Sequence, residues 1–342
     1  MRRPRWLAPD HHPSAVYHCF SRIVDRRPVL GDAEKELFRS LLRELAEFCQ
    51  LRILTFCVMS NHFHVLVEVP KPPQPLPTAE ETLDALARLS GCQDVGAARQ
   101  QLLSFRQSND PDAEARWLAR FHARRWNLSN FFKVLKQRFS ALYNRRHGRK
   151  GTLWEERFKS VLVEGEGRAL VTMAAYIDLN PVRAGLVQDP KDYRWCGYSE
   201  AVAGIPEAQD GPRRIVRTLQ ANETVTEQQA LESYRRHLFV EGSEEGESIR
   251  EDGRTVRGSI TREAVLKVLA AKGRLSTAEY LRCRVRYFCD GAVFGSRPFV
   301  ESLFQSARHR FSPRRTTGAR PIRGLAEGGL FTLRAFRVHV FG

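Results

Sequence analysis

Two histidines separated by a single residue open a predicted β-strand at residues 61–69, whose sequence is NHFHVLVEV. One face of this strand is apolar, because hydrophobic residues alternate along it: Phe63, Val65, Val67 and Val69. His62 and His64 share the opposite face, about 6.6 Å apart along the strand, since residues i and i+2 point to the same side. Their imidazoles can therefore hold one metal ion, although two hydrogen-bonded structural histidines would have the same spacing.

A second pair of side chains could serve the same ion. Tyr176 and Asn180 lie four residues apart in a predicted helix, so one turn places them on one face, about 6 Å apart. An amide oxygen is a suitable ligand for a hard cation. A site made of this oxygen and two imidazoles leaves coordination positions open for water and phosphate oxygens, which suits Mg²⁺ or Mn²⁺. The alternative is a core aromatic and a helix terminus, because Pro181 follows Asn180.

The charge of the chain indicates a polyanionic partner. Lys and Arg number 55 against 39 Asp and Glu, which gives a net charge of +16 and a pI near 10.0. Phosphate contacts release counterions and favour such an excess, so nucleic acid is the expected partner. The alternative is a soluble protein from an arginine-rich lineage.

Composition excludes several classes. With 342 residues, 42% of them hydrophobic and 27% charged, the chain should fold into roughly two domains. No apolar run approaches the ~18 residues of a membrane span, and no signal peptide is evident, so we expect a cytoplasmic protein. Seven cysteines without a CxxC pair predict reduced thiols. No glycine-rich phosphate-binding motif is present, so no nucleotide cofactor is expected.

Hydrophobic periodicity predicts the elements that position these side chains. Strands are predicted at residues 16–23, 52–59, 61–69 and 152–165, and helices at residues 32–50, 127–150 and 169–180. Pro181 should stop the last helix. The two neighbouring strands 52–59 and 61–69 predict an antiparallel hairpin.

Two regions fall outside this pattern. A proline-rich stretch at 70–77 leads into a charged helical segment, which predicts an insertion at about 71–126. Residues 201–342 are predicted to be a mainly helical accessory region with a basic tail at 314–324. Two segments there, 261–273 and 276–289, loosely resemble a helix-turn-helix, so the region could bind DNA or could only pack.

Several motifs together resemble a known family. The histidine pair is accompanied by SRIVDRRPVL, GTLWEERFKS, YIDLNPVRAGLV and YRWCGYSE. This set is similar to the HUH single-tyrosine transposases, most of all to the REP-associated tyrosine transposases of the insertion-sequence-200-like superfamily. The resemblance covers roughly residues 14–70 and 127–200. The family usually passes briefly from the histidine strand to the next helix, whereas about 55 residues intervene here.

The resemblance implies a fold, an activity and residue roles. Residues 1–200 should form an α+β, ferredoxin-like domain with an antiparallel sheet, as a monomer or homodimer. His62, His64 and Asn180 match the metal ligands, and Tyr176 matches the nucleophile. The implied enzyme is an Mg²⁺- or Mn²⁺-dependent transposase that cuts and rejoins single-stranded DNA near REP-like hairpins through a 5′-phosphotyrosine.

The chemistry of a phenol agrees with a metal requirement. With a pKa near 10, Tyr176 is a poor nucleophile unless a divalent ion polarises the scissile phosphate. One ester replaces another, so no ATP is needed. Two alternatives remain: a domesticated relative that grips structured DNA without cutting it, and a metal hydrolase of another class. The latter needs carboxylate ligands, and only Glu68 shares the histidine face, where it could also orient a histidine or end the strand in solvent.

Basic residues near these motifs are candidates for phosphate contacts. They are Arg145, Arg146, Arg149, Lys150, Arg157, Lys159 and Arg183. Aromatic residues are interspersed among most of them, but we expect most of these rings to be core. Arg183 could bind substrate phosphate or brace the loop after the tyrosine helix.

Overall fold

A computed structural model describes residues 5–9, 12–89, 95–108, 110–220, 224–239, 248–249, 255–256, 275–336 and 340. The amino-terminal part alternates strands and helices in the order β1 (Ser14–Arg22), α1 (Asp32–Cys49), β2 (Arg52–Val58), β3 (His62–Pro70), α5 (Leu128–Arg146) and β4 (Lys159–Val163). These four strands pair antiparallel in the order β2-β3-β1-β4. This arrangement is the ferredoxin-like βαββαβ pattern, so the predicted fold class is confirmed.

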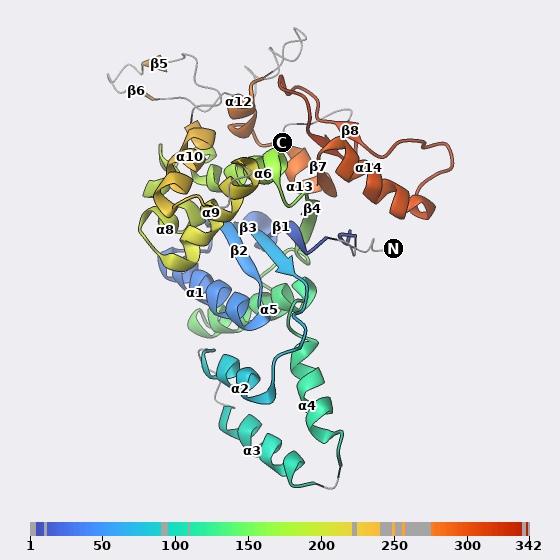
Figure 1. The fold of residues 1–342 in the computed structure, drawn as a ribbon. Coiled ribbons are helices and arrows are strands. Elements are labelled where there is room, and N and C mark those ends of the chain that lie inside the picture. Colours follow the sequence, from blue (N-terminus) through green and yellow to red (C-terminus); the bar gives the residue numbers. More distant parts are fainter. Residues whose placement is uncertain are drawn as a thin grey trace.

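Helices α1 and α5 cover one face of this sheet (Figure 1). They bury the apolar face of β3, because Phe63, Val65 and Val67 lie in the same core cluster as both helices. The histidine face of β3 is therefore the opposite one, where Leu66 packs against α6 (Gly167–Asp178). The predicted division of the strand into an apolar face and a histidine face is confirmed.

The second face carries most of the remaining helices. They are α7 (Asn180–Arg183), α8 (Gly197–Val202), α9 (Pro206–Gln220), α10 (Glu227–Phe239), α12 (Thr277–Leu281) and α13 (Arg286–Asp290). Short 3-10 turns occur elsewhere in the chain at Val24–Arg26, Pro190–Asp192 and Arg308–Arg310. Helix α9 approaches β2 so closely that a Cβ on Gly211 would lie 1.9 Å from the Leu54 carbonyl oxygen. Only glycine permits this contact.

The segment between β3 and α5 projects from the body as a small helical lobe (Figure 1). Its helices are α2 (Ala79–Ala87), α3 (Val95–Arg106) and α4 (Ala113–His122). A capping box at Thr78 and Glu81 starts α2. The helical character predicted for this insertion is confirmed.

Most of the described elements of the carboxy-terminal region are helices, as predicted, but the region also contributes strands that we did not predict. Strand β7 (Val293–Gly295) pairs in parallel with β4, and β9 (Phe331–Thr332) and β8 (Arg320–Pro321) extend the same sheet to seven strands. The region also contains α14 (Arg297–Ser306) and a separate two-stranded pair, β5 (Ser248–Ile249) and β6 (Thr255–Val256). The basic tail is tied down, because Glu301 accepts bonds from the backbone N–H groups of Gly318 and Ala319.

Three further expectations can be compared with the structure. Of the loose helix-turn-helix, residues 261–273 lie outside the described residues, and 276–289 form two short helices that pack beside the candidate site. The six cysteines that the structure describes are free. Within the described residues, no helix combines the length and apolar character needed to cross a membrane.

Candidate active site

The histidine pair lies at the start of β3, beside a third histidine that the sequence analysis did not single out. His64 faces the side of the sheet that α6 covers, and it is 3% exposed. Its Nδ1 lies 2.8 Å from Nε2 of His18 on β1. Nδ1 of His18 lies 2.8 Å from the backbone oxygen of Phe288 in α13. His62 contacts His64 edge to face, with ring centroids 5.1 Å apart, and its Nδ1 lies 2.6 Å from Oδ1 of Asn61.

Burial keeps these imidazoles neutral near pH 7. It lowers the pKa of His18 to about 4, and it lowers the pKa of His62 to about 3, with further repulsion from Arg22 and Arg284. Burial also lowers the pKa of His64 well below its ordinary value. Neutral imidazole is the form that binds a metal ion.

Tyr176 lies directly beside the histidines. It is 2% exposed, and its ring centroid is 6.1 Å from those of both His18 and His64. Phe288 packs on the ring at 4.6 Å, and the hydroxyl lies 3.6 Å from Sγ of Cys289. Burial raises the pKa of the phenol, because the tyrosinate would be poorly solvated here. The structure therefore brings strand and helix residues together, as the shared faces predicted.

Asn180 lies just beyond the end of the tyrosine helix rather than in its last turn. Helix α6 ends at Asp178, and Pro181 lies at the start of the short helix α7 rather than after the last turn. The Asn180 Nδ2 donates to the carbonyls of Tyr176 (3.4 Å) and Ile177 (3.1 Å). Only Oδ1 remains for a metal ion, and within the described residues no hydrogen bond links Asn180 to either histidine.

The donor set fits a divalent ion of the Mg²⁺ or Mn²⁺ type. Nδ1 of both strand histidines is occupied, which leaves the two Nε2 atoms as nitrogen donors, and ligating histidines commonly use their second nitrogen in this way. No group of three or more His, Cys, Asp or Glu side chains suited to a metal occurs in the part of the chain that the structure describes. The Asn180 oxygen, water and phosphate oxygens are the further ligands expected for such an ion.

Arg183 braces the site. Its guanidinium donates to the carbonyls of Leu281 (2.8 Å) and Tyr176 (2.6 Å) and lies 4.1 Å from the centroid of the Tyr176 ring. Of the two roles that the sequence allowed, these contacts match bracing rather than phosphate binding.

Glu68 neither orients a histidine nor ends the strand in solvent. Its side chain is 2% exposed and accepts bonds from Ser14 (2.6 Å) and Arg214 (3.1 Å), with Arg52 at 3.5 Å. The two arginines offset the cost of its burial. Both sequence-based readings of Glu68 were wrong.

The remaining basic candidates lie at the surface. Arg145, Arg146 and Lys150 are exposed around the turn that follows α5, and Arg149 is partly buried. Arg146 lies 3.6 Å from Glu34. The aromatic residues between the basic ones are mostly core, as expected: Phe131, Phe132, Tyr143 and Trp154.

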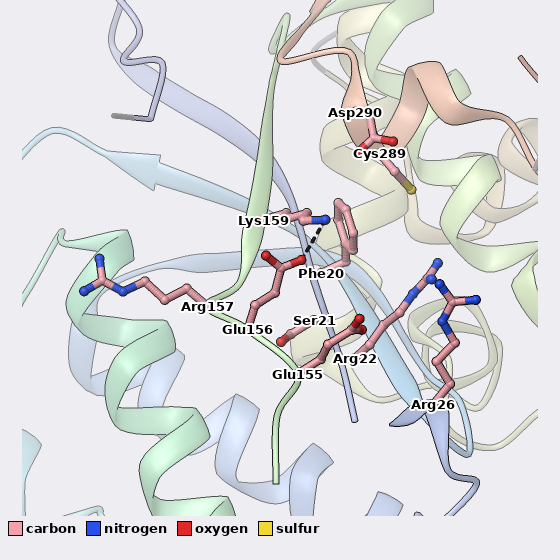
Figure 2. A pocket seen from close by; sticks show the side chains of 10 residues that line it. All are labelled: Phe20, Ser21, Arg22, Arg26, Glu155, Glu156, Arg157, Lys159, Cys289 and Asp290. Atoms are coloured by element: carbon pink, nitrogen blue, oxygen red, sulfur yellow. Dashed lines mark ion pairs between the residues drawn. The ribbon is translucent and has the colours of Figure 1, made fainter. Parts of the chain in front are cut away.

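A polar cleft of about 140 Å³ opens beside the histidines (Figure 2). Its lining residues are Phe20, Ser21, Arg22, Arg26, Glu155, Glu156, Arg157, Lys159, Cys289 and Asp290. Arg22 is the register partner of His62, and Cys289 contacts the Tyr176 hydroxyl, so the cleft adjoins both the histidine pair and Tyr176. Lys159 is paired with Glu156 at 2.7 Å, whereas Arg157 points away from this pair (Figure 2).

Two arginines lie together in this cleft, with the Glu155 carboxylate near Arg22. The guanidinium groups of Arg22 and Arg26 extend in the same direction in Figure 2. The pKa of Arg22 is lowered by burial and by repulsion from Arg284 and Arg26. Arg26 sits in a turn with positive φ at Asp25 (59°) and Arg26 (55°), a conformation that costs about 1 kcal/mol per residue. Such a cluster of cations suits an anion.

Comparisons with known proteins agree with the family resemblance in one part of the chain. Residues 12–78, which include the histidine strand, match the family model described as "Transposase IS200 like". The resemblance to this transposase family is therefore confirmed for that segment. Among curated proteins, no significant match to the chain is found.

One similar solved structure is that of a REP-associated tyrosine transposase bound to a REP hairpin. It is 14% identical, the match covers 59% of this chain and 85% of that chain, and the TM-score is 0.36.

Proposed function

We propose that the protein is a metal-dependent transposase of single-stranded DNA, which cuts and rejoins strands next to REP-like hairpins through a 5′-phosphotyrosine at Tyr176. The observation that carries the proposal is the contact of Tyr176 on α6 with His64 on β3, which in turn contacts His62. The match of residues 12–78 to IS200-like transposases supports the same chemistry.

In this proposal the chain's own residues perform the strand exchange. The Tyr176 oxygen forms a bond to the scissile phosphorus while the bond to the 3′ oxygen breaks. The phenolic proton leaves, and the departing 3′ oxygen takes up a proton. A later attack by another 3′-hydroxyl reverses these steps and releases the tyrosine. His62 and His64, with the Asn180 oxygen, would hold the divalent ion, which supplies charge neutralisation at the phosphate.

The cleft of Figure 2 gives the DNA strand a route to this pocket. Arg22 and Arg26 would bind a phosphate next to the scissile one, because both line the cleft and Arg22 is the register partner of His62. Arg157, Lys159 and the basic turn at 145–150 would contact phosphates further along the strand or hairpin. In the described conformation Phe288 and Cys289 cover Tyr176, so α13 must move before a phosphate can reach the hydroxyl.

The cover over Tyr176 also favours a second candidate function, a relative that binds structured DNA without cutting it. A nucleophile that is 2% exposed and whose phenol is difficult to ionise would be inert if α13 never moved. The two candidates share the DNA partner and differ only in chemistry.

The decisive experiment incubates the full chain with 5′- and 3′-labelled single-stranded hairpin DNA and Mn²⁺, and looks for a protein–DNA adduct on a denaturing gel. We expect an adduct and a cut strand, both lost in Tyr176→Phe, which keeps the ring and its packing. Tyr193→Phe is the matched control, because its buried hydroxyl donates to the Val58 carbonyl and should have no part in cleavage. Hairpin binding without an adduct in wild-type protein would favour the second candidate.

A further inference from the structure

His18 is a buried polar side chain that contacts both His64 and Tyr176 but belongs to none of the sequence motifs. It is 0% exposed, lies on β1, and connects His64 to the Phe288 carbonyl through its two ring nitrogens. The two hydrogen bonds are both 2.8 Å long, which is good geometry for each.

The chemistry of the partners fixes the direction of this hydrogen-bond chain. A carbonyl oxygen only accepts, so Nδ1 of His18 must carry the proton that it donates to Phe288. A neutral imidazole with a proton on Nδ1 has a lone pair on Nε2. Nε2 of His18 therefore accepts, and Nδ1 of His64 must donate to it. His64 consequently has its lone pair on Nε2.

An independent pair of contacts gives His62 the same tautomer. The Asn61 amide nitrogen donates to the Arg26 carbonyl at 2.8 Å, which orients the amide and turns its oxygen toward His62. That oxygen accepts from Nδ1 of His62, so the lone pair of His62 is also on Nε2. Two separate hydrogen bonds therefore leave the Nε2 lone pairs of both strand histidines available to a metal ion.

The opposite tautomer at His64 would be costly. It would place the His64 Nδ1 lone pair against the His18 Nε2 lone pair at 2.8 Å and would present an N–H where a metal ion needs a donor. In solution a free imidazole exchanges between its tautomers, so an acceptor placed at Nδ1 preorganises the ligand before any ion arrives.

We propose that His18 is a positioning residue that holds His64 in the Nδ1–H tautomer and links this metal ligand to α13 through the Phe288 carbonyl. The role of His64 as a metal ligand rests on the proposed function. The tautomer of His64 follows from the hydrogen bonds alone. Because Phe288 lies 270 residues from His18 in the sequence, the carboxy-terminal segment is coupled to the metal ligand by two hydrogen bonds. Displacement of α13 would remove the acceptor that orients His18.

The first test reads the tautomers of the metal-free full chain by ¹⁵N–¹H correlation spectra of the histidine rings. We expect His64, His62 and His18 all to be protonated at Nδ1 and unprotonated at Nε2. The second test measures Mn²⁺ binding to the full chain without DNA. Neither readout depends on cleavage, so a protein that never cuts DNA can still satisfy this inference, and a cutting protein can still fail it.

Substitutions at His18 separate hydrogen bonding from packing. In His18→Phe the ring volume remains but His64 loses its acceptor, so we expect a mixture of His64 tautomers and about 10- to 100-fold weaker Mn²⁺ binding. In His18→Gln the amide oxygen can accept from His64 while the amide nitrogen donates to Phe288, so tautomer and affinity should be largely retained. His18→Asn reaches only the Nδ1 position and should behave as His18→Phe does.

Val16→Ala is the matched control, since it removes packing on the same face of β1 without touching the hydrogen-bond chain. It should leave the His64 tautomer and the Mn²⁺ affinity as in wild type. If His18→Phe does not fold, the comparison of His18→Gln with His18→Asn carries the test. An Nε2–H tautomer of His64 in wild type, or unchanged tautomer and affinity in the folded His18→Phe or His18→Asn protein, would overturn the inference.

Discussion

Asp178 should make the stability of this protein fall as the pH rises toward 7. The carboxyl is 0% exposed at the end of α6, two residues from Tyr176, and accepts hydrogen bonds from Thr55 (2.5 Å) and Tyr234 (2.6 Å). Burial raises its pKa from 3.8 to about 6 despite these bonds. The folded protein therefore binds the proton more tightly than the unfolded chain does.

The sign and the size of the effect follow from this shift. The stabilising contribution is complete below pH 3.8 and is lost as the pH rises through 6. The rise of the pKa from 3.8 to about 6 corresponds to about 3 kcal/mol, most of which falls between pH 4 and pH 7. Asp178→Asn cannot titrate, so its free energy of unfolding should rise relative to wild type by on the order of 2 to 3 kcal/mol over this interval.

The assay is urea unfolding of wild type and Asp178→Asn at several pH values from 4 to 7. The buried histidines titrate in the same interval with the opposite sign, but they are common to both proteins and cancel in the difference. Asp32→Asn, at a side chain that is 81% exposed, is the control and should track wild type. If the difference between Asp178→Asn and wild type stays constant across the interval, the carboxyl does not titrate as described and the reasoning fails.

Three further outcomes test other parts of the structure. His64→Ala should abolish adduct formation with Mn²⁺ while hairpin affinity in a gel-shift assay stays near that of wild type, because phosphate contacts are made elsewhere; unchanged cleavage would remove the ion from the mechanism. Arg22→Gln should weaken DNA binding and lower the slope of log K against log salt by about 1, whereas an unchanged slope would exclude a phosphate contact. Gly211→Ala should lower the free energy of unfolding by about 1–3 kcal/mol in urea, since its Cβ would meet the Leu54 carbonyl at 1.9 Å; a neutral effect would mean that α9 can shift freely.

Local patterns predicted the parts of the fold that depend on one segment at a time. The alternation of β3 separated the valines from the histidines, and the ferredoxin-like order of elements followed from the family resemblance. Tyr176 lies against the histidine face, as predicted, because the helix that follows β4 packs on that face of the sheet.

What the sequence could not show depends on long-range pairing. His18 meets His64 only because β1 pairs with β3 in one register, with Phe20 opposite His64, and a shift by one residue would turn His18 to the other face. The end of the tyrosine helix was predicted two residues too late for a different reason, since Pro181 lies in the first turn of a new short helix instead of only ending the old one. Strand β7 is three residues long, too short to show any alternation.

The parallel pairing of β7 with β4 also has a consequence for how the protein avoids self-association. Without β7 the ferredoxin-like sheet would end at β4, whose backbone N–H groups at Leu162 and Glu164 now donate to the carbonyls of Ala292 and Phe294. A bare edge of this kind is a template for pairing with another chain. During synthesis the β4 edge is complete long before residue 293 is made, so the nascent chain must pass through a stage in which its sheet is open on that side, and truncation before β7 would make that aggregation-prone stage permanent.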